Sequence, residues 1–330
     1  MERRVLAGDI GGTKTNLALY AVEGARHLRL LRERSFPSRD YPGLEAVLEA
    51  FAPASEGPVA SAAFGIAGPV IDNVVQTTNL PWTVEAVALA RSIGCARVRL
   101  MNDLETTSYG ALFLPEDELR VLQPGVRRRG NIAVIAAGTG LGQGFLFWEG
   151  GRHHPVATEG GHADFAPGTE IEIELLRFLT KIYGHVSVER VLSGPGLHNI
   201  FRFLVEGLGR GVEAAVRERL RDAEDAGAVI GAAGTSGECA TCAEAVGLFV
   251  GIYGAQAGNL ALAGLAVGGV YVGGGIVIRM LPRIESGAFI DAFRSKGRYE
   301  RMMSEIPVYA ILNAKTSLIG AGHAASELLP

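Results

Sequence analysis

The stretch that decides the fold of this 330-residue chain is GDIGGTKT, which runs from Gly8 to Thr15. It follows the P-loop pattern G-x-x-x-x-G-K-[ST] except at Thr13, where that loop needs a glycine. A P-loop opens a helix, but NLALYAV after this turn alternates in the two-residue period of a strand. RRVLAGDI before the turn also reads as a strand. We therefore reject the P-loop and predict a β-hairpin whose turn contains Gly11 and Gly12.

The composition excludes several classes of protein. Hydrophobic residues make up 48% of the chain and charged residues 20%, which predicts a large core and no global disorder. The formal net charge of −4 offers no basic field for binding nucleic acid. Three cysteines are too few for a disulfide framework, and the N-terminus does not read as a signal peptide. We expect a cytoplasmic protein, in which Cys239 and Cys242 are buried thiols.

A stretch without charge, residues 245–278, raises the question of a membrane span. Its hydropathy is diluted by Gln256, Asn259 and many glycines and alanines, and it breaks at Gly268 before the strand-like run VYVGGGIVI. We interpret it as a buried helix followed by a buried strand and expect no membrane contact.

The theme of the first hairpin recurs in NIAVIAAGTGLGQGFLFWEGG, which begins at Asn131. Each half opens with strand, glycine turn and strand, and helices and further strands follow; one helix is expected over TVEAVALARSIG with Thr83 as its N-cap. We predict a two-domain α/β fold with duplicated βββαβα-type halves and an interdomain cleft. The small domain would comprise residues 1–112 and 305–330, and the large domain residues 113–304.

Both glycine turns have the chemistry of phosphate sites, because a backbone amide at glycine approaches phosphate oxygens with no Cβ between them. An aspartate at the end of a strand beside such a turn is suited to hold Mg²⁺ through water. The alternative is an ordinary tight hairpin with a solvated carboxylate. The candidates for binding the phosphates are Asp9, Gly11, Gly12 and Thr13 in the first turn and Gly138, Thr139 and Gly140 in the second.

Polar residues elsewhere indicate a second ligand. Asn102 and Asp103 follow a buried strand, where ligands of open α/β sheets bind, and a carboxylate there is suited to act as a general base. Glu159, His162 and Glu189 lie in glycine-bent loops and offer the donors and acceptors that a polyhydroxylated ligand requires. Helix capping and structural roles remain the alternatives for all five residues.

Seven motifs in order then resemble the bacterial ATP-dependent glucokinase family, of the hexokinase–actin–Hsp70 fold. They are DIGGTKTNLAL, MNDLETTSYGA, AAGTGLGQGF, TEGGHADFAP, ERVLSGPGLHNIF, GGVYVGGGIV and GRYERMMSEIPVYAI. The resemblance implies that Asp103 is the catalytic base and that the two hairpins hold ATP with Mg²⁺. It implies that Gly273 and Gly274 lie near the adenosine. The residues that it implies for glucose binding are Asn102, Asp103, Glu159, His162 and Glu189.

Three questions stay open at this point. The sugar could be another hexose phosphorylated by the same mechanism, and the donor could be ADP or polyphosphate in place of ATP. A non-catalytic nucleotide-binding scaffold of the actin or Hsp70 type is the alternative from a different class. A homodimer is an expectation that rests on the family resemblance alone.

Overall fold

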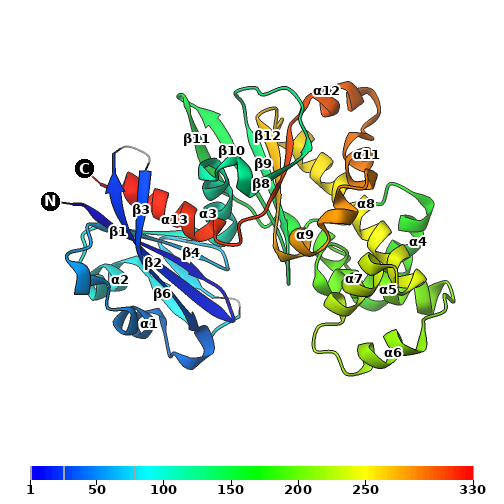
Figure 1. The fold of residues 1–330 in the computed structure, drawn as a ribbon, viewed down its shortest axis with the longest axis horizontal. Helices are drawn as coiled ribbons and strands as arrows, with labels where there is room; N and C mark the ends of the chain where they lie inside the picture. Colours follow the sequence, from blue (N-terminus) through cyan, green and yellow to red (C-terminus); the bar gives the residue numbers. More distant parts are fainter. Residues whose placement is uncertain (1, 25–26, 78, 330) are drawn as a thin grey trace. The chain divides into compact units, whose positions relative to one another are not determined.

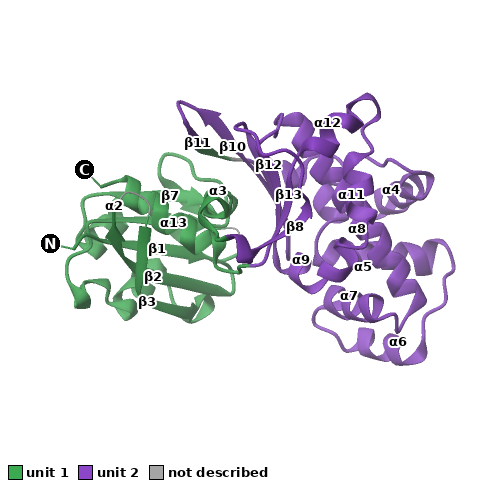
Figure 2. Cartoon of the chain, turned by 45° about the horizontal axis from the view of Figure 1, so that its top comes forward, with its two compact units in different colours: residues 1–115, 154–157, 313–330 green, residues 116–153, 158–312 purple. Residues whose placement is uncertain are grey.

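The computed structural model describes residues 2–24, 27–77 and 79–329, which form two compact units (Figure 2). The first unit contains residues 1–115, 154–157 and 313–330, and the second contains residues 116–153 and 158–312. Each unit is built on one main β-sheet with helices packed against it.

The sheet of the first unit has five strands in the order β3-β2-β1-β4-β7. Strands β1 to β3 are antiparallel, whereas β4 and β7 run parallel to β1. The predicted hairpin is confirmed, since Ile10 at the end of β1 pairs with Thr15 in β2. The strands are β1 (Arg4–Ile10), β2 (Lys14–Glu23), β3 (His27–Pro37), β4 (Ser61–Ile66) and β7 (Val98–Asn102); a separate pair comprises β5 (Val74–Gln76) and β6 (Thr83–Glu85).

The two faces of this sheet are covered by different helices, because alternate side chains of a strand point to opposite faces. Leu6 and Ile10 of β1 lie in the apolar core that also contains the buried side chains of α1 (Leu44–Phe51) and α2 (Ala86–Ile93). Asp9 points to the other face, which α13 (Thr316–Glu327) covers together with α3 (Asp103–Gly110). In Figure 1 the C-terminal helix α13, in red, lies against the sheet formed by the N-terminal strands.

The second unit repeats this topology. Its sheet has the order β11-β10-β9-β12-β13-β8, in which β9 and β10 form the second hairpin and β12 and β13 run parallel to β9; residues 154–157 of the edge strand β11 are grouped with the first unit. The order of the first five strands matches that of the first unit strand for strand, which confirms the predicted duplication. The strands are β8 (Leu119–Gln123), β9 (Ile132–Ala137), β10 (Leu141–Glu149), β11 (Arg152–Ala157), β12 (Gly269–Gly273) and β13 (Val308–Ile311).

The core of the second unit forms around one long helix, α8 (Ala240–Ala263). By length and composition alone α8 could cross a membrane, but 61% of its apolar window is buried inside the protein, as in a core helix. Cys239 and Cys242 at its start are free and buried, as expected. The other helices are α4 (Glu170–Tyr183), α5 (Gly194–Arg202), α6 (Ala214–Arg221), α7 (Ala226–Ser236), α9 (Gly275–Arg279), α10 (Leu281–Ile284), α11 (Ala288–Arg294) and α12 (Glu300–Glu305).

Three details differ from the sequence-based expectations. Thr83 does not cap a helix; it lies in β6, which pairs with β5, and α2 begins at Ala86. The run VYVGGGIVI is a strand only to Gly273, because Gly274 has a φ of 92° and a helix follows. Residues 305–312 lie in the second unit, since β13 pairs with β12 and β8.

A close crossing of α3 and α13 generates the first prediction. A Cβ on Gly110 would lie 1.9 Å from the carbonyl oxygen of Thr316, a backbone atom that has no side-chain freedom to retreat. We expect Gly110→Ala to lower the free energy of unfolding of the first unit by roughly 2–3 kcal/mol, in urea unfolding followed by circular dichroism.

Gly247 supplies the matched control, because it is exposed on α8 and a Cβ there would meet nothing within 4 Å. Gly247→Ala should stabilise the protein by about 0.5–1 kcal/mol, as alanine does in an open helix position. Equal changes in unfolding free energy for the two substitutions would contradict a close contact between α3 and α13 at Gly110.

Candidate active site

One buried serine, Ser38, makes two hydrogen bonds to the backbone of the first glycine turn. The Ser38 hydroxyl donates a hydrogen bond to the carbonyl oxygen of Gly11 at 2.8 Å, and its backbone N–H donates to the carbonyl oxygen of Thr13 at 3.0 Å. Both bonds tie down carbonyl groups of the turn, which would otherwise repel an approaching phosphate. Ser38 was not among the residues predicted from the sequence, because it follows β3 and belongs to no motif around the turn.

Asp9 precedes this turn at the end of β1, and side chains hold both of its carboxylate oxygens. Oδ1 accepts a hydrogen bond from the Ser317 hydroxyl at 2.8 Å, and Oδ2 accepts one from Asn16 Nδ2 at 3.3 Å. Burial raises the pKa of Asp9 above its ordinary value, and these two hydrogen bonds oppose the shift. A nearby cation would favour the ionised form of such a carboxyl.

Asn102 and Asp103 lie where β7 passes into α3. Asn102 is the N-cap: its Oδ1 accepts from the backbone N–H of Leu104 at 2.9 Å, and its Nδ2 donates to the carbonyl oxygen of Gly68 at 3.1 Å. Glu105 completes a capping box with the backbone N–H of Asn102. The capping alternative therefore describes Asn102. Asp103 is the first helical residue, half-buried beside it, and its Oδ1 also accepts from the Leu104 N–H at 2.8 Å.

The first unit brings these candidates to one edge of its sheet. Strands β1, β4 and β7 are parallel neighbours, so their carboxyl ends meet at the same edge. Asp9 and the glycine turn lie at the end of β1, and Asn102 and Asp103 lie at the end of β7. A phosphate-type turn and an adjacent carboxylate at this edge suit phosphoryl transfer to a hydroxyl group.

The second glycine turn is anchored to the start of a helix. The Gly138 N–H donates to the carbonyl oxygen of Gly140 at 2.8 Å, which closes the turn. The Gly194 N–H, in the first turn of α5, donates to the carbonyl oxygen of Gly138, also at 2.8 Å. Thr139 is exposed at the tip of the turn.

The remaining sugar-site candidates surround this second turn. Glu189 Oε2 accepts from the Leu141 N–H at 2.9 Å, and a Cβ on Gly140 would lie 2.6 Å from the same oxygen. The loop that carries Glu159 and His162 packs on the hairpin too, since a Cβ on Gly161 would lie 2.1 Å from the carbonyl oxygen of Leu141. Both of these side chains are exposed. Glu159, His162 and Glu189 are thus brought together in the second unit.

Gln143 on β10 is a second residue that was not predicted from the sequence. Its side chain is buried against Gly160, where a Cβ would lie 2.6 Å from Gln143 Oε1. Its Nε2 finds no hydrogen-bond partner within the described residues. Only the fold could show this residue beside the Glu159 loop, because its position in the sequence is that of an ordinary strand residue.

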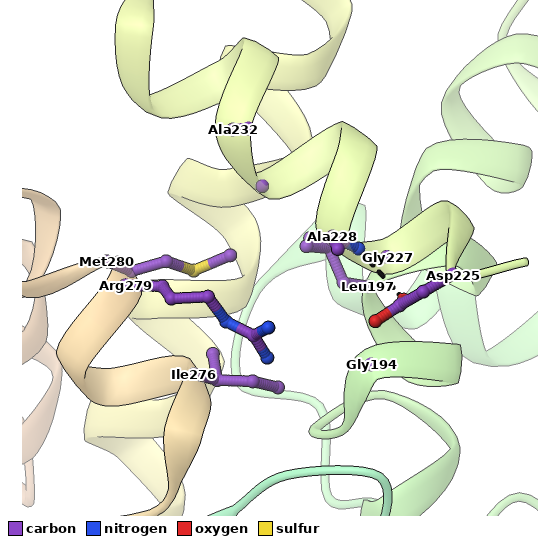
Figure 3. Close-up of a pocket in the computed structure, with 10 residues that line it drawn as sticks. Gly194, Leu197, Asp225, Gly227, Ala228, Ala232, Ile276, Arg279 and Met280 are labelled. Atoms are coloured by element: carbon purple, nitrogen blue, oxygen red, sulfur yellow. Dashed lines mark hydrogen bonds between the residues drawn. The ribbon is translucent and has the colours of Figure 1, made fainter. Parts of the chain in front are cut away.

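A cavity of about 240 Å³ opens beside the second turn and lies wholly within the second unit (Figure 3). Gly194 lines it and also bonds the turn, so cavity and turn are adjacent. Gly274 precedes the helix that forms one wall, and a Cβ on Gly274 would lie 2.1 Å from the carbonyl oxygen of Ala137. The lining residues are Gly194, Leu197, Asp225, Gly227, Ala228, Gly231, Ala232, Ile276, Arg279 and Met280.

The candidate residues therefore form two sets, one in each unit. The described residues contain no cluster of three or more His, Cys, Asp or Glu side chains with the spacing of a metal site. This donor set fits Mg²⁺ held by one carboxylate and by nucleotide phosphates, which is the usual way that kinases bind it. It does not fit a metal enclosed by protein ligands alone.

A duplicated α/β fold in which both halves open with a hairpin around a glycine turn is the hexokinase-like class of fold. Comparison with known proteins narrows the class. The family model of glucokinase matches residues 6–328. The curated glucokinase of Nostoc sp. (strain PCC 7120) is 40% identical over 339 residues, which cover 98% of this chain and 99% of that protein.

Solved structures agree with this comparison. The glucokinase from an Antarctic psychrotroph has a TM-score of 0.86 and 29% identity, and the match covers 99% of this chain and 100% of that one. A ROK family glucokinase from Streptomyces griseus, solved in complex with glucose and AMPPNP, shares the fold at 21% identity and a TM-score of 0.64, with coverage of 98% and 99%. The chain belongs to the glucokinase family.

The two bonds of the Asn102 side chain generate the second prediction. Asn102→Ala removes one of the two acceptors of the Leu104 N–H, the other being Asp103 Oδ1, and leaves the carbonyl oxygen of Gly68 without its donor, so we expect a loss of about 1–2 kcal/mol in unfolding free energy. Asn102→Ser keeps a capping hydroxyl but is too short to reach Gly68, and about half of that loss should remain. Urea unfolding of the two variants checks the order; an equal loss would show that only the bond to Gly68 stabilises the fold.

Proposed function

We propose that this chain phosphorylates D-glucose on its 6-hydroxyl group, with ATP as the donor and Asp103 as the general base. The Asp103 carboxylate takes the proton of the hydroxyl while its oxygen attacks the γ-phosphorus. The bond between that phosphorus and the bridging oxygen breaks, and ADP leaves with the electron pair. The products are glucose 6-phosphate and ADP.

One observation carries the proposal: the turn of Gly11, Gly12 and Thr13 follows β1 and Asp103 follows β7, and these parallel strands flank β4, so both groups lie at one edge of one sheet. In phosphoryl transfer the protein contributes mainly position and charge neutralisation. A base for the acceptor hydroxyl and amides for the phosphates are the two groups that have to be close together. Family membership supplies the sugar, since the curated relatives are glucokinases.

We assign the sugar to Asn102 and Asp103 from the first unit and to Glu159, His162 and Glu189 from the second. Hydroxyl groups of a hexose need both donors and acceptors, and a set with an amide, an imidazole and carboxylates supplies both. Glu189 uses only Oε2 for the bond to Leu141, and a carboxylate has a second oxygen to offer. The two sets act on the same sugar and nucleotide in this proposal, and an interdomain cleft remains a prediction.

We assign the nucleotide to the two glycine turns and the cavity beside the second. Gly138, Thr139 and Gly140 would hold phosphate oxygens together with Gly11, Gly12 and Thr13. The cavity next to Gly274 is largely apolar and large enough for a purine ring, with Asp225 and Arg279 as its charged residues. Asp9 would hold Mg²⁺ through water, and the bound ion would neutralise charge on the phosphates.

The remaining assignments follow from composition and burial. We propose a cytoplasmic enzyme, in line with its three free, buried thiols and the burial of α8. The net charge of −4 argues against nucleic acid as a partner. A homodimer stays a prediction, which light scattering of the purified protein would test.

The third prediction tests the reaction itself. Purified protein with Mg-ATP should release ADP slowly alone and much faster with D-glucose, and a panel of mannose, fructose and glucosamine should stimulate less. A different preferred sugar would keep the mechanism and replace the substrate. Absence of stimulation by every sugar, with ATP bound, would favour the nucleotide-binding scaffold.

Asp103→Asn and Asp103→Ala serve in the same assay as tests of the base. Both should lower kcat by at least about 10²-fold, the lower range of general-base effects, while glucose still binds in calorimetry. Turnover close to that of the unsubstituted protein would remove Asp103 from this role.

The fourth prediction concerns the cavity. Ala228→Phe places a ring in the space next to α9, so we expect KM for ATP to rise about tenfold or more while glucose affinity stays the same. Glucose calorimetry and thermal unfolding of the same variant are the internal controls. An unchanged KM for ATP would place the base of the nucleotide elsewhere, and ADP or polyphosphate would then be tried as donors.

A further inference from the structure

A short chain of hydroxyl groups links Asp9 to the start of α3. Ser317 Oγ, in the first turn of α13, lies 2.8 Å from Asp9 Oδ1 and 2.9 Å from Thr106 Oγ1. Thr106 Oγ1 lies 2.9 Å from the carbonyl oxygen of Asp103. Ser317 thus connects the carboxylate at the end of β1 with the residue that we assign as the base. All four residues belong to the first unit.

Each hydroxyl has one proton, and this decides which of the groups donate and which accept. An ionised carboxylate only accepts hydrogen bonds, so the single hydroxyl proton of Ser317 goes to Asp9. The contact between Ser317 and Thr106 then requires Thr106 to donate, and its one proton is shared between Ser317 Oγ and the carbonyl oxygen of Asp103. The Ser317 hydroxyl therefore donates to Asp9, and Thr106 Oγ1 contacts the Ser317 hydroxyl from the other side.

The surrounding backbone leaves space for these two hydroxyls and for little else. A Cβ on Gly65 of β4 would lie 2.2 Å from Thr106 Oγ1 and 3.1 Å from Ser317 Oγ. Thr106 is fully buried and Ser317 nearly so. The close α3–α13 crossing at Gly110 and Gly320 fixes the separation of the helices that carry the two hydroxyls.

We propose that Ser317 is a positioning residue that sets the orientation of the Asp9 carboxylate toward the cation of the nucleotide complex. This inference rests on the proposed function. Its basis is the difference between the two bonds to Asp9: the one from Ser317 is 2.8 Å long, whereas the one from Asn16 is 3.3 Å long. Groups that orient a metal-binding carboxylate typically affect metal affinity or activity by 10-fold or more.

Mn²⁺ is the probe for the test, because its free concentration is measured directly by electron paramagnetic resonance. The full-length protein is titrated with Mn²⁺ in the presence of ADP. Ser317→Ala should weaken Mn²⁺ binding roughly tenfold and lower kcat, while the dissociation constant for glucose without nucleotide stays the same. Ser317→Cys keeps only a weak donor, in a group slightly larger than a hydroxyl, so its Mn²⁺ affinity should lie between those of Ser317→Ala and the unsubstituted protein.

Ser326 provides the matched control on the same helix. Its hydroxyl donates to the carbonyl oxygen of His323 at 2.8 Å and does not contact Asp9. Ser326→Ala should leave Mn²⁺ affinity and kcat unchanged. A lower thermal stability of Ser317→Ala with unchanged Mn²⁺ affinity would mean that Ser317 only stabilises the helix contact.

Asp9→Asn distinguishes a failure of the Ser317 inference from a failure of the Asp9 assignment. If Asp9→Asn weakens Mn²⁺ binding and neither Ser317 variant does, the inference is overturned and the proposed function stands. If Asp9→Asn binds Mn²⁺ as the unsubstituted protein does, the Asp9 assignment itself fails, and the Ser317 inference fails with it. Glucose-stimulated ADP release, measured independently, shows whether the kinase activity is present in either case.

Discussion

The hydrogen bond from Ser317 to the half-buried Asp9 carboxylate joins the last helix to the first strand, and the candidate site of the first unit is built around it. Burying a charge without partners is costly, and Asp9 lies on the sheet face that α13 covers. One of its two donors, Asn16, lies in the next strand, and the other, Ser317, lies 308 residues later in the chain, on the C-terminal helix that packs against the first sheet. The same helix, α13, also packs against α3, whose first residue is Asp103. One polar contact thus joins the sheet, the two helices and the candidate base.

The two units use the same topology for different chemistry. Each begins with an antiparallel hairpin around a glycine turn, which we propose as a phosphate site, and each continues with strands parallel to the first. In the first unit Asn102 and Asp103, which we propose as groups for a hydroxyl substrate, lie at the end of β7, two strands from β1. In the second unit α5 begins at the turn and a cavity lies beside it, which is suited to a nucleotide. The two halves thus have similar glycine turns, and the groups beside each turn give it a different proposed role.

Local patterns were sufficient for much of the fold. The two hairpins, the strand that ends in Asn102 and the buried nature of α8 were predicted from alternation, turn glycines and apolar runs, and the structure confirms them. The prediction was wrong at Thr83, where strand pairing overrides a capping residue, and after Gly273, where one residue with positive φ turns an apolar run into a helix. Ser38 and Ser317 lie outside the seven motifs, and Thr106 and Gln143 lie inside motifs whose pattern gives them no role, so only their contacts connect these residues with the candidate site.

The sequence by itself determined the class of fold, the two glycine turns, the candidate base and the family, because these depend on residue order over a few positions. The tertiary structure decided which groups support them by hydrogen bonds. Ser38 bonds the first turn, the Gly194 N–H bonds the second, and Ser317, in contact with Thr106, bonds Asp9. The physical reason is that hydrogen bonds and burial depend on distance in space. A serine at the far end of the chain is indistinguishable from any other serine until the chain folds and brings it within 2.8 Å of the carboxylate that needs it.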